Sequence, residues 1–479
     1  MKLLRPPVTR SPTPDRLNGA SLAVVGVSLL LLVATVAIFP SALLLTALLI
    51  AVLVGVLVFG HSVELFVLGL VLIRASLDSA GGGGAVTPSS LVGVVVIATT
   101  IVWLGLRPRP VKHPRSRLQI ALLFYAAAIA LSIFVSLRPL TSAVEFVRFA
   151  SAVCIFLLVD RLIASGASER RLLAVILASA VLPLGVAAFD IITSGTIESK
   201  GDFDRLSSTF AQSNGFSRYL MVLIIMGLAS LGIWRNRFTK AIVLGGCLAG
   251  ASALVLTYTR ASWIGAVFGI AIVIFYNRKY RLPAAITALV VLLVASPALV
   301  SRFADLGGSD QGVAAISSAN SLEWRLNYWN DVIDLADDSP VNGIGYGVTA
   351  KVTDQEKQPH SELIRAYVEL GIIGLIAYAL MLGALLHTAL VALQSTSGAA
   401  RSFSVGYLAS VISFALVTLV TNALSQTALL WYLFALSAIA LSLSRRNATA
   451  LTHGPPMSTT LQSQWAFAED RPALPVHGR

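Results

Sequence analysis

One histidine and three arginines are the residues of this chain whose types and spacing best suit polar chemistry. His360 is followed by Ser361, which can cap a helix, and a polar stripe of Glu362, Arg365 and Glu369 begins beside it. An imidazole, with a reference pKa of about 6.5, can accept a proton at neutral pH. A general base is therefore one interpretation of His360, and a structural histidine is the other.

The three arginines suit the binding of phosphate. Arg205 opens a polar run that ends at Asn214, Arg260 follows Tyr258-Thr259 at the expected start of a helix, and Arg325 lies in a segment with a helical apolar repeat of Leu322, Leu326, Trp329 and Ile333. A planar guanidinium can bind two phosphate oxygens at once. The alternative for each arginine is an anchor at a membrane surface. The segment around Arg325 is expected to form an amphipathic helix over the site.

The elements that must position these residues are membrane helices. Of the 479 residues, 56% are hydrophobic and 12% are charged, and no Asp, Glu, Lys or Arg occurs from Leu17 to Val63 or from Ser402 to Ser444. A run of about 20 apolar residues can cross a bilayer as a helix. The composition excludes soluble and disordered chains, and the continuous apolar blocks exclude a β-barrel. The sequence predicts an all-α polytopic membrane protein.

We expect about 14 transmembrane helices, with 12–14 as the range, because the division of residues 21–75 is weakly marked. The expected spans are 21–39, 41–59, 62–75, 91–106, 118–137, 142–160, 172–193, 217–234, 241–258, 261–277, 283–300, 366–391, 403–422 and 427–443.

The distribution of basic residues predicts the orientation. Four alternate loops, 107–117, 161–171, 235–240 and 278–281, hold 14 Lys and Arg, and the intervening loops hold five. Cytoplasmic loops carry the excess of Lys and Arg, so both termini are expected in the cytoplasm and the chain in the cytoplasmic (inner or plasma) membrane. The net charge of +12 then reflects these loops and not a nucleic-acid partner.

The orientation also predicts the domain organisation. It comprises a cytoplasmic N-terminal tail (1–20), a transmembrane domain (21–443) with a large extracytoplasmic loop containing short helices (301–361), and a disordered cytoplasmic tail (444–479). Of the six histidines, this topology leaves His360 alone outside, on the same face as Arg205 and Arg260. No cluster of acidic residues suggests a metal there, and no cofactor is expected.

The order of these blocks resembles the O-antigen ligase/polymerase family. The resemblance covers roughly residues 200–390 and rests on Arg205…Thr209-Phe210…Asn214, Tyr258-Thr259-Arg260, Arg325…Trp329…Pro340…Gly343-Ile344-Gly345, and His360-Ser361-Glu362-Leu363 followed by Glu369-Leu370-Gly371-Ile372-Ile373-Gly374-Leu375. Two positions depart from the common pattern, since Ser361 replaces an Asn and Thr259 replaces a Ser. They leave the subfamily open.

The resemblance implies a metal-independent glycosyltransferase that uses a polyprenyl-diphosphate-linked glycan donor at the outer face of the membrane. The acceptor is a glycan or a lipid-linked glycan, and membrane lipids surround the enzyme. By the same resemblance, Arg205 and Arg260 bind the donor diphosphate and His360 activates the acceptor hydroxyl. Arg325, Asn214 and Glu362 are candidates for positioning. A base on the opposite side of the anomeric carbon from the leaving group predicts inversion of configuration.

Two other functions compete with this interpretation. A transporter or flippase for lipid-linked sugars tends to show repeats, broken helices and ionisable residues at the bilayer midplane. This sequence instead gathers its arginines and the outer histidine at one surface. A non-catalytic assembly partner is the third alternative. The choice between polymerase and ligase, the sugar, the acceptor and the oligomeric state stay open.

The topology has a direct test. Single cysteines placed in 301–361 and in 107–117, with Cys154 and Cys247 replaced, should react oppositely with a membrane-impermeant thiol reagent on intact cells. The first loop should be labelled and the second protected, because only the first is expected outside. Labelling of 107–117 in intact cells would reverse the orientation.

Overall fold

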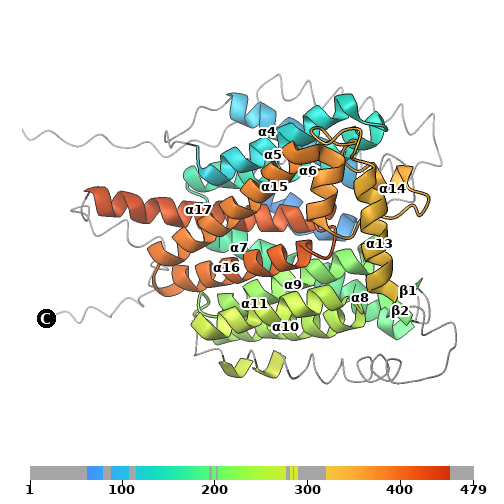
Figure 1. Ribbon diagram of the computed structural model, residues 1–479. Helices are drawn as coiled ribbons and strands as arrows, with labels where there is room; N and C mark the ends of the chain where they lie inside the picture. The colour runs from blue at the N-terminus through green and yellow to red at the C-terminus, as the bar shows by residue number, and fades with distance from the viewer. Residues whose placement is uncertain are drawn as a thin grey trace, which may run out of the picture. The chain divides into compact units, whose positions relative to one another are not determined.

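The computed structural model describes residues 62–78, 88–106, 115–193, 197–200, 203–276 and 320–453, with a few residues between 281 and 289 (Figure 1). The predicted spans 21–39 and 41–59, most of 283–300, and the tail from residue 454 lie outside these residues. The chain divides into two units, Met1–Ile73 and Arg74–Arg479. The described helix of the first unit is α3 (Val63–Ile73), and everything below concerns the second.

Seven helical stretches of the described residues are long and apolar enough to cross a membrane. They are α5 (Arg117–Val135), α6 (Pro139–Ala164), α7 (Glu169–Ala178) together with α8 (Val181–Thr193), α10 (Arg237–Leu256), α15 (Glu362–Ser395), α16 (Gly398–Thr418) and the apolar part of α17 (Thr427–His453). Shorter apolar helices lie within α4 (Pro88–Leu106) and form α11 (Arg260–Tyr276). The predicted helical membrane fold is confirmed, while the total of fourteen spans stays a prediction.

Helix α17 is, with α9 (Ser213–Ser230), one of the two most enclosed helices among the described residues. In its apolar stretch, Thr427–Arg446, 94% of the most apolar window is buried, and the helix packs against α6, α15 and α16. A helix that is apolar on all sides must be surrounded, which explains why no charge interrupts Ser402–Ser444. Helix α9 (Ser213–Ser230) packs in turn against α10, α11 and α16. Since α17 continues to His453, the first ten residues of the predicted disordered tail are helical.

A short ribbon departs from the all-α prediction. Strands β1 (Ile197–Lys200) and β2 (Phe203–Leu206) pair antiparallel, and their register sets Arg205 opposite Glu198. The predicted loop that carries Arg205 is therefore partly a hairpin.

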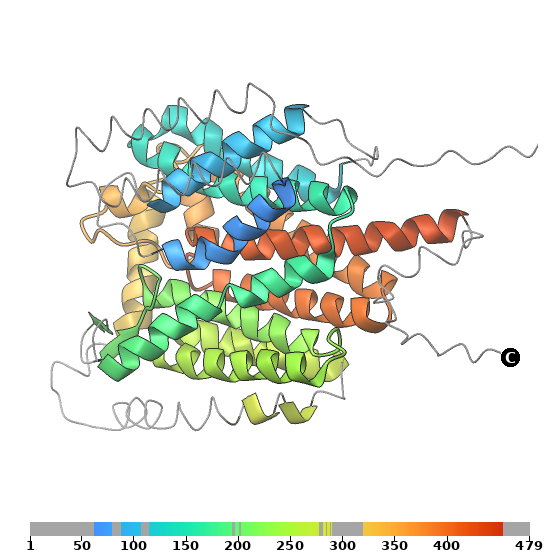
Figure 2. The ribbon, with the colours of Figure 1, turned by 180° about the vertical axis from the view of Figure 1, so that it is seen from behind.

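The described part of the large predicted loop contains α13 (Asn320–Asp334) and α14 (Thr349–Val352). Figures 1 and 2 show α13 running across the ends of the long helices. The predicted helix is confirmed and is amphipathic. Its most buried residues, however, each precede by one position a residue of the predicted apolar repeat. Tyr328 and Val332 are buried, with Trp329 and Ile333 partly so, in a cluster with Ala336, Ile344, Val348 and Val368. Helix α13 therefore rests on the protein itself, above the start of α15.

The glycine-rich segment Gly343–Gly347 is held on α15 by Glu369. One carboxylate oxygen, Oε2, accepts from the Gly347 amide (2.7 Å), and the other, Oε1, accepts from the Thr349 hydroxyl (2.9 Å). The backbone adds bonds from Ile344 N–H to Val368 O and from Gly345 N–H to Glu369 O, both 3.0 Å. These amide groups are already bonded to the protein, so the segment is a turn and not a phosphate loop.

Helix α15 bends at Gly371, as Figure 1 shows. The φ of Gly371 is 66° and its ψ is −163°, a conformation that favours glycine. The next amide, Ile372 N–H, bonds to Pro340 O (2.9 Å) and not to its own helix. A Cβ on residue 371 would lie 2.1 Å from Val341 O. The bend therefore lets residues 362–370 pack under the loop while the rest of α15 crosses the bundle.

Replacing Gly371 with Ala should destabilise the protein. Positive φ alone costs about 1–3 kcal/mol for a non-glycine residue, and the clash with Val341 adds to this cost. The midpoint of thermal unfolding of the purified protein should fall by several degrees. Gly383→Ala is the matched control, because Gly383 lies on the same helix with nothing within 4 Å of its Cβ position. An equal fall in both variants would contradict the role given to the bend.

Candidate active site

Loops that the basic-residue count assigns to one face meet at one end of the bundle, which we name the site end. Leu137 N–H bonds to Ile344 O (3.0 Å), joining the α5–α6 turn to the glycine-rich segment. Leu424 N–H, between α16 and α17, donates to Glu362 Oε1 (2.6 Å). The Thr259 hydroxyl, before α11, donates to Asn214 Oδ1 on α9 (3.1 Å). The site end therefore brings together segments far apart in the sequence.

His360 lies at the site end, in the connection that leads into α15. It is half-buried and has a φ of 55°, which is uncommon for a residue other than glycine. The segment before it is tied to α13: Trp329 Nε1 donates to Pro359 O (2.6 Å), and the Tyr328 hydroxyl donates to Lys357 O. Ser361 takes the predicted N-cap position, although its side chain makes no cap bond. Helix α13 thus fixes the turn that presents His360.

Arg260 is the first residue of α11, and its side chain is exposed. The preceding Tyr258 has a φ of 51°, and Thr259 is held by Asn214. A second contact, Ser217 Oγ to Ser262 Oγ at 2.8 Å, joins α9 to the same turn. The free amide groups at the start of a helix carry a partial positive charge that attracts anions. The guanidinium of Arg260 adds a full positive charge at the same place. The predicted residues Asn214 and Arg260 are therefore brought together.

Arg205 lies on β2 with a half-buried side chain whose Nε atom is buried without a hydrogen-bond partner in the described part of the chain. The residues after it are well anchored: Thr209 Oγ1 donates to Ala75 O (2.8 Å), and Phe210 packs against Tyr219 with ring centroids 5.2 Å apart. The third predicted arginine, Arg325, lies on α13, and only its backbone is described.

A fully buried ion triad lies directly after His360. The Arg365 guanidinium donates from Nε to Glu369 Oε2 (2.8 Å), and its Nη1 is 3.6 Å from Glu362 Oε1. All three residues are 0% exposed. The guanidinium also lies over the Tyr346 ring, 4.3 Å from its centroid. Burial raises the pKa of Tyr346 well above its usual value, so Arg365 faces a neutral phenol.

A second buried arginine extends this triad toward α9. Arg218 Nη1 donates to Asn422 O (3.3 Å), two residues before the amide that binds Glu362. Several buried atoms here have no partner within the described residues: Arg218 Nε, Asn422 Oδ1, Glu362 Oε2, Arg365 Nη2 and Tyr346 Oη. Buried polar groups normally have partners, so water or a polar substrate group would complete these bonds.

Sequence reasoning named Glu362 but left Arg218, Arg365 and Asn422 outside the site. Charged residues within apolar helices were the signal for the two arginines, because such residues are costly and usually functional. Asn422 gave no such signal, since a neutral amide at the end of a span is common.

Comparison with known families identifies part of the chain. Residues 245–379 match the family described as O-antigen ligase. This range holds Arg260, α13, the glycine-rich segment, His360 and Glu369, whereas Arg205 and Asn214 precede it. No curated protein matches the chain. Residues 245–379 are therefore similar to O-antigen ligases, which confirms the resemblance to the O-antigen ligase/polymerase family and supports a role in processing membrane glycans.

Proposed function

We propose that this protein is a glycosyltransferase that transfers or polymerises glycan from a polyprenyl-diphosphate donor at the outer face of the cytoplasmic membrane. The supporting observation is that the range similar to O-antigen ligases includes both Arg260 and His360, and that both lie in turns fixed by contacts at the site end. Exopolysaccharide or cell-wall glycan synthesis is the setting that fits this activity.

The reaction moves one glycosyl group. The bond between the anomeric carbon and the diphosphate oxygen breaks, and the acceptor hydroxyl forms a new bond to that carbon. His360 takes the hydroxyl proton, and the polyprenyl diphosphate leaves with the bonding electrons. Arg205 and Arg260 stabilise the charge that grows on the diphosphate, so the leaving group needs no metal. Attack opposite the leaving group inverts the configuration.

The other predicted residues act by positioning. Asn214 holds Thr259 and so fixes the turn that carries Arg260. Glu362 binds the Leu424 amide and thereby fixes the α15 start beside His360. Arg325 lies on α13, the helix that anchors the turn before His360, and is assigned to donor or acceptor placement.

A transporter or flippase is the second candidate. Two observations favour it: the bend of α15 at Gly371, and the buried charges Arg218 and Arg365 within helices. The two functions differ in covalent product. Detergent-solubilised protein given a polyprenyl-diphosphate glycan and an acceptor should form a longer or transferred glycan only if it is an enzyme, because solubilisation removes the two compartments that transport requires.

Arg205→Ala and Arg260→Ala should each lower turnover by about 10²–10³-fold, the usual effect of removing one group that stabilises a developing anion. Lys should rescue only in part, because an ammonium cannot bind two oxygens in one plane. Turnover per folded protein is the measurement. Arg138→Ala is the control, since Arg138 is exposed in a turn on the same predicted face but is not assigned to the diphosphate.

Two results would overturn this part of the mechanism. Full activity of both Lys variants would show that only a point charge is required. Loss of activity in EDTA, with recovery on adding a divalent ion, would show that a metal and not the arginine pair stabilises the leaving group.

His360→Ala should lower turnover by about 10²–10⁴-fold, the contribution typical of general-base catalysis. Donor binding should persist, because the arginines hold the diphosphate. Wild-type turnover should fall on acidification, since a protonated imidazole cannot accept the hydroxyl proton, and the variant should lose this dependence. Turnover and donor binding per folded protein are to be measured together.

Glu356→Ala provides the matched control. Glu356 lies in the same connection, also with positive φ (48°), and is exposed. Its loss should leave turnover unchanged. A purely structural His360 predicts a different outcome, in which His360→Ala lowers thermal stability while turnover per folded molecule stays near that of the wild type.

A further inference from the structure

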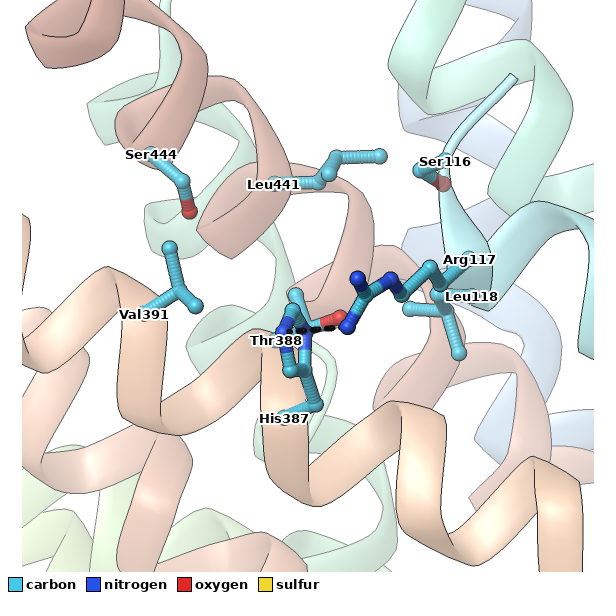
Figure 3. A pocket seen from close by; sticks show the side chains of 8 residues that line it. All are labelled: Ser116, Arg117, Leu118, His387, Thr388, Val391, Leu441 and Ser444. Atoms are coloured by element: carbon cyan, nitrogen blue, oxygen red, sulfur yellow. Dashed lines mark hydrogen bonds between the residues drawn. The ribbon is translucent and has the colours of Figure 1, made fainter.

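A pocket of about 290 Å³ lies between α5, α15 and α17, away from the site end. Figure 3 shows Arg117, at the start of α5, pointing toward His387 of α15, with Leu118, Val391 and Leu441 around the two side chains. The far end of α5 reaches Ile344 at the site end through Leu137. A helix of 19 residues is about 28 Å long, so the pocket and the site lie at opposite ends of the bundle.

The polar side of this pocket is cationic. Arg117 Nη1 lies 3.2 Å from His387 Nε2. A guanidinium only donates, so Nε2 is the acceptor in this contact. None of the lining residues is acidic. Arg117 therefore brings a positive charge to the pocket that no lining carboxylate balances.

Two other basic residues at this end are paired with carboxylates, which Arg117 is not. Arg445 binds Asp160 (2.7 Å) and Arg446 binds Glu169 (2.6 Å). No carboxylate pairs with Arg117 among the described residues. The sequence just before it, 107–115, adds four more Lys and Arg and no acidic residue. The pocket thus offers an anion a positive charge that no described carboxylate compensates.

The surface beside the pocket is apolar. On α15, Leu386 and Leu390 flank His387 and are 39% and 41% exposed, as expected for side chains that face lipid. An occupant with an anionic head at Arg117 and acyl chains along these leucines matches both surfaces. Basic pockets between membrane helices bind the head groups of anionic lipids.

We propose that this pocket binds the phosphate of an anionic phospholipid, with Arg117 and His387 contacting the head group and the acyl chains lying along α15. The site is separate from the glycan chemistry and does not depend on the proposed function. A soluble phosphate shares the head-group chemistry but lacks the chains that would cover Leu386 and Leu390.

Native mass spectrometry of the full-length protein in detergent can test the proposal, with phosphatidylglycerol and phosphatidylcholine as probes. The wild type should bind the first phosphatidylglycerol more tightly than phosphatidylcholine. Arg117→Ala should weaken phosphatidylglycerol binding about fivefold and leave phosphatidylcholine unchanged, because one basic residue contributes about 1 kcal/mol toward an anionic lipid. Arg117→Gln, which keeps more of the side chain's packing, should give the same result.

Arg237→Ala is the matched control. Arg237 is exposed and is the first residue of α10 after a capped start, as Arg117 is on α5, but it does not line the pocket. Its loss should not alter binding. An equal effect of both substitutions would reduce the preference to general surface charge and overturn the proposal. Unchanged phosphatidylglycerol binding in the Arg117 variants would also overturn the proposal. Displacement of the lipid by inorganic phosphate at the lipid's own concentration would do the same.

Discussion

The buried guanidinium of Arg365 is the constraint on which the site end depends. A charge removed from water must be paired, and breaking a buried pair typically costs about 3–5 kcal/mol. Arg365 meets this requirement with Glu369 and Glu362, and each carboxylate then binds a different segment: Glu369 the glycine-rich turn, and Glu362 the turn before α17. Satisfying one buried charge therefore fixes three parts of the chain relative to one another.

This arrangement explains how loops of low regularity can hold reactive groups in place. His360 precedes the triad immediately, and its other flank is tied to α13 through the carbonyl of Pro359. Arg260 depends on a separate support, the contact of Thr259 with Asn214. The two supports are joined through the buried helices α9 and α16, which pack on each other, and through the bond from Arg218 of α9 to Asn422 O. Preorganisation of the proposed base and of the diphosphate site thus comes from the helical bundle and not from contacts between them.

The sequence predicted what depends on local periodicity and charge. The apolar runs marked most described helices within a few residues, and the repeat from Leu322 to Ile333 marked α13. Contacts between distant segments were not predictable: Glu362 and Leu424 are separated by 62 positions, and either could have bonded to water. The β1–β2 ribbon was missed because its four-residue strands, Ile-Glu-Ser-Lys and Phe-Asp-Arg-Leu, lack a clear apolar alternation. Tyr328 and Val332 are more deeply buried than Trp329 and Ile333 because of where α15 lies, and a local repeat contains no information on that position.

The enclosure of α17 has a consequence for biosynthesis. A polytopic protein inserts its helices in chain order and packs them afterwards, since each helix is stable in the bilayer alone. Here α17, which follows the other described helices in the chain, is also the one that α6, α15 and α16 surround. The helices made before α17 therefore insert into the membrane before the helix that they pack around is present. The turn at Leu424 can bind Glu362 only after α17 has packed against them. Completion of the site end is in this way tied to the synthesis of α17, so a nascent chain that stops before α17 would carry most residues of the site without their final arrangement.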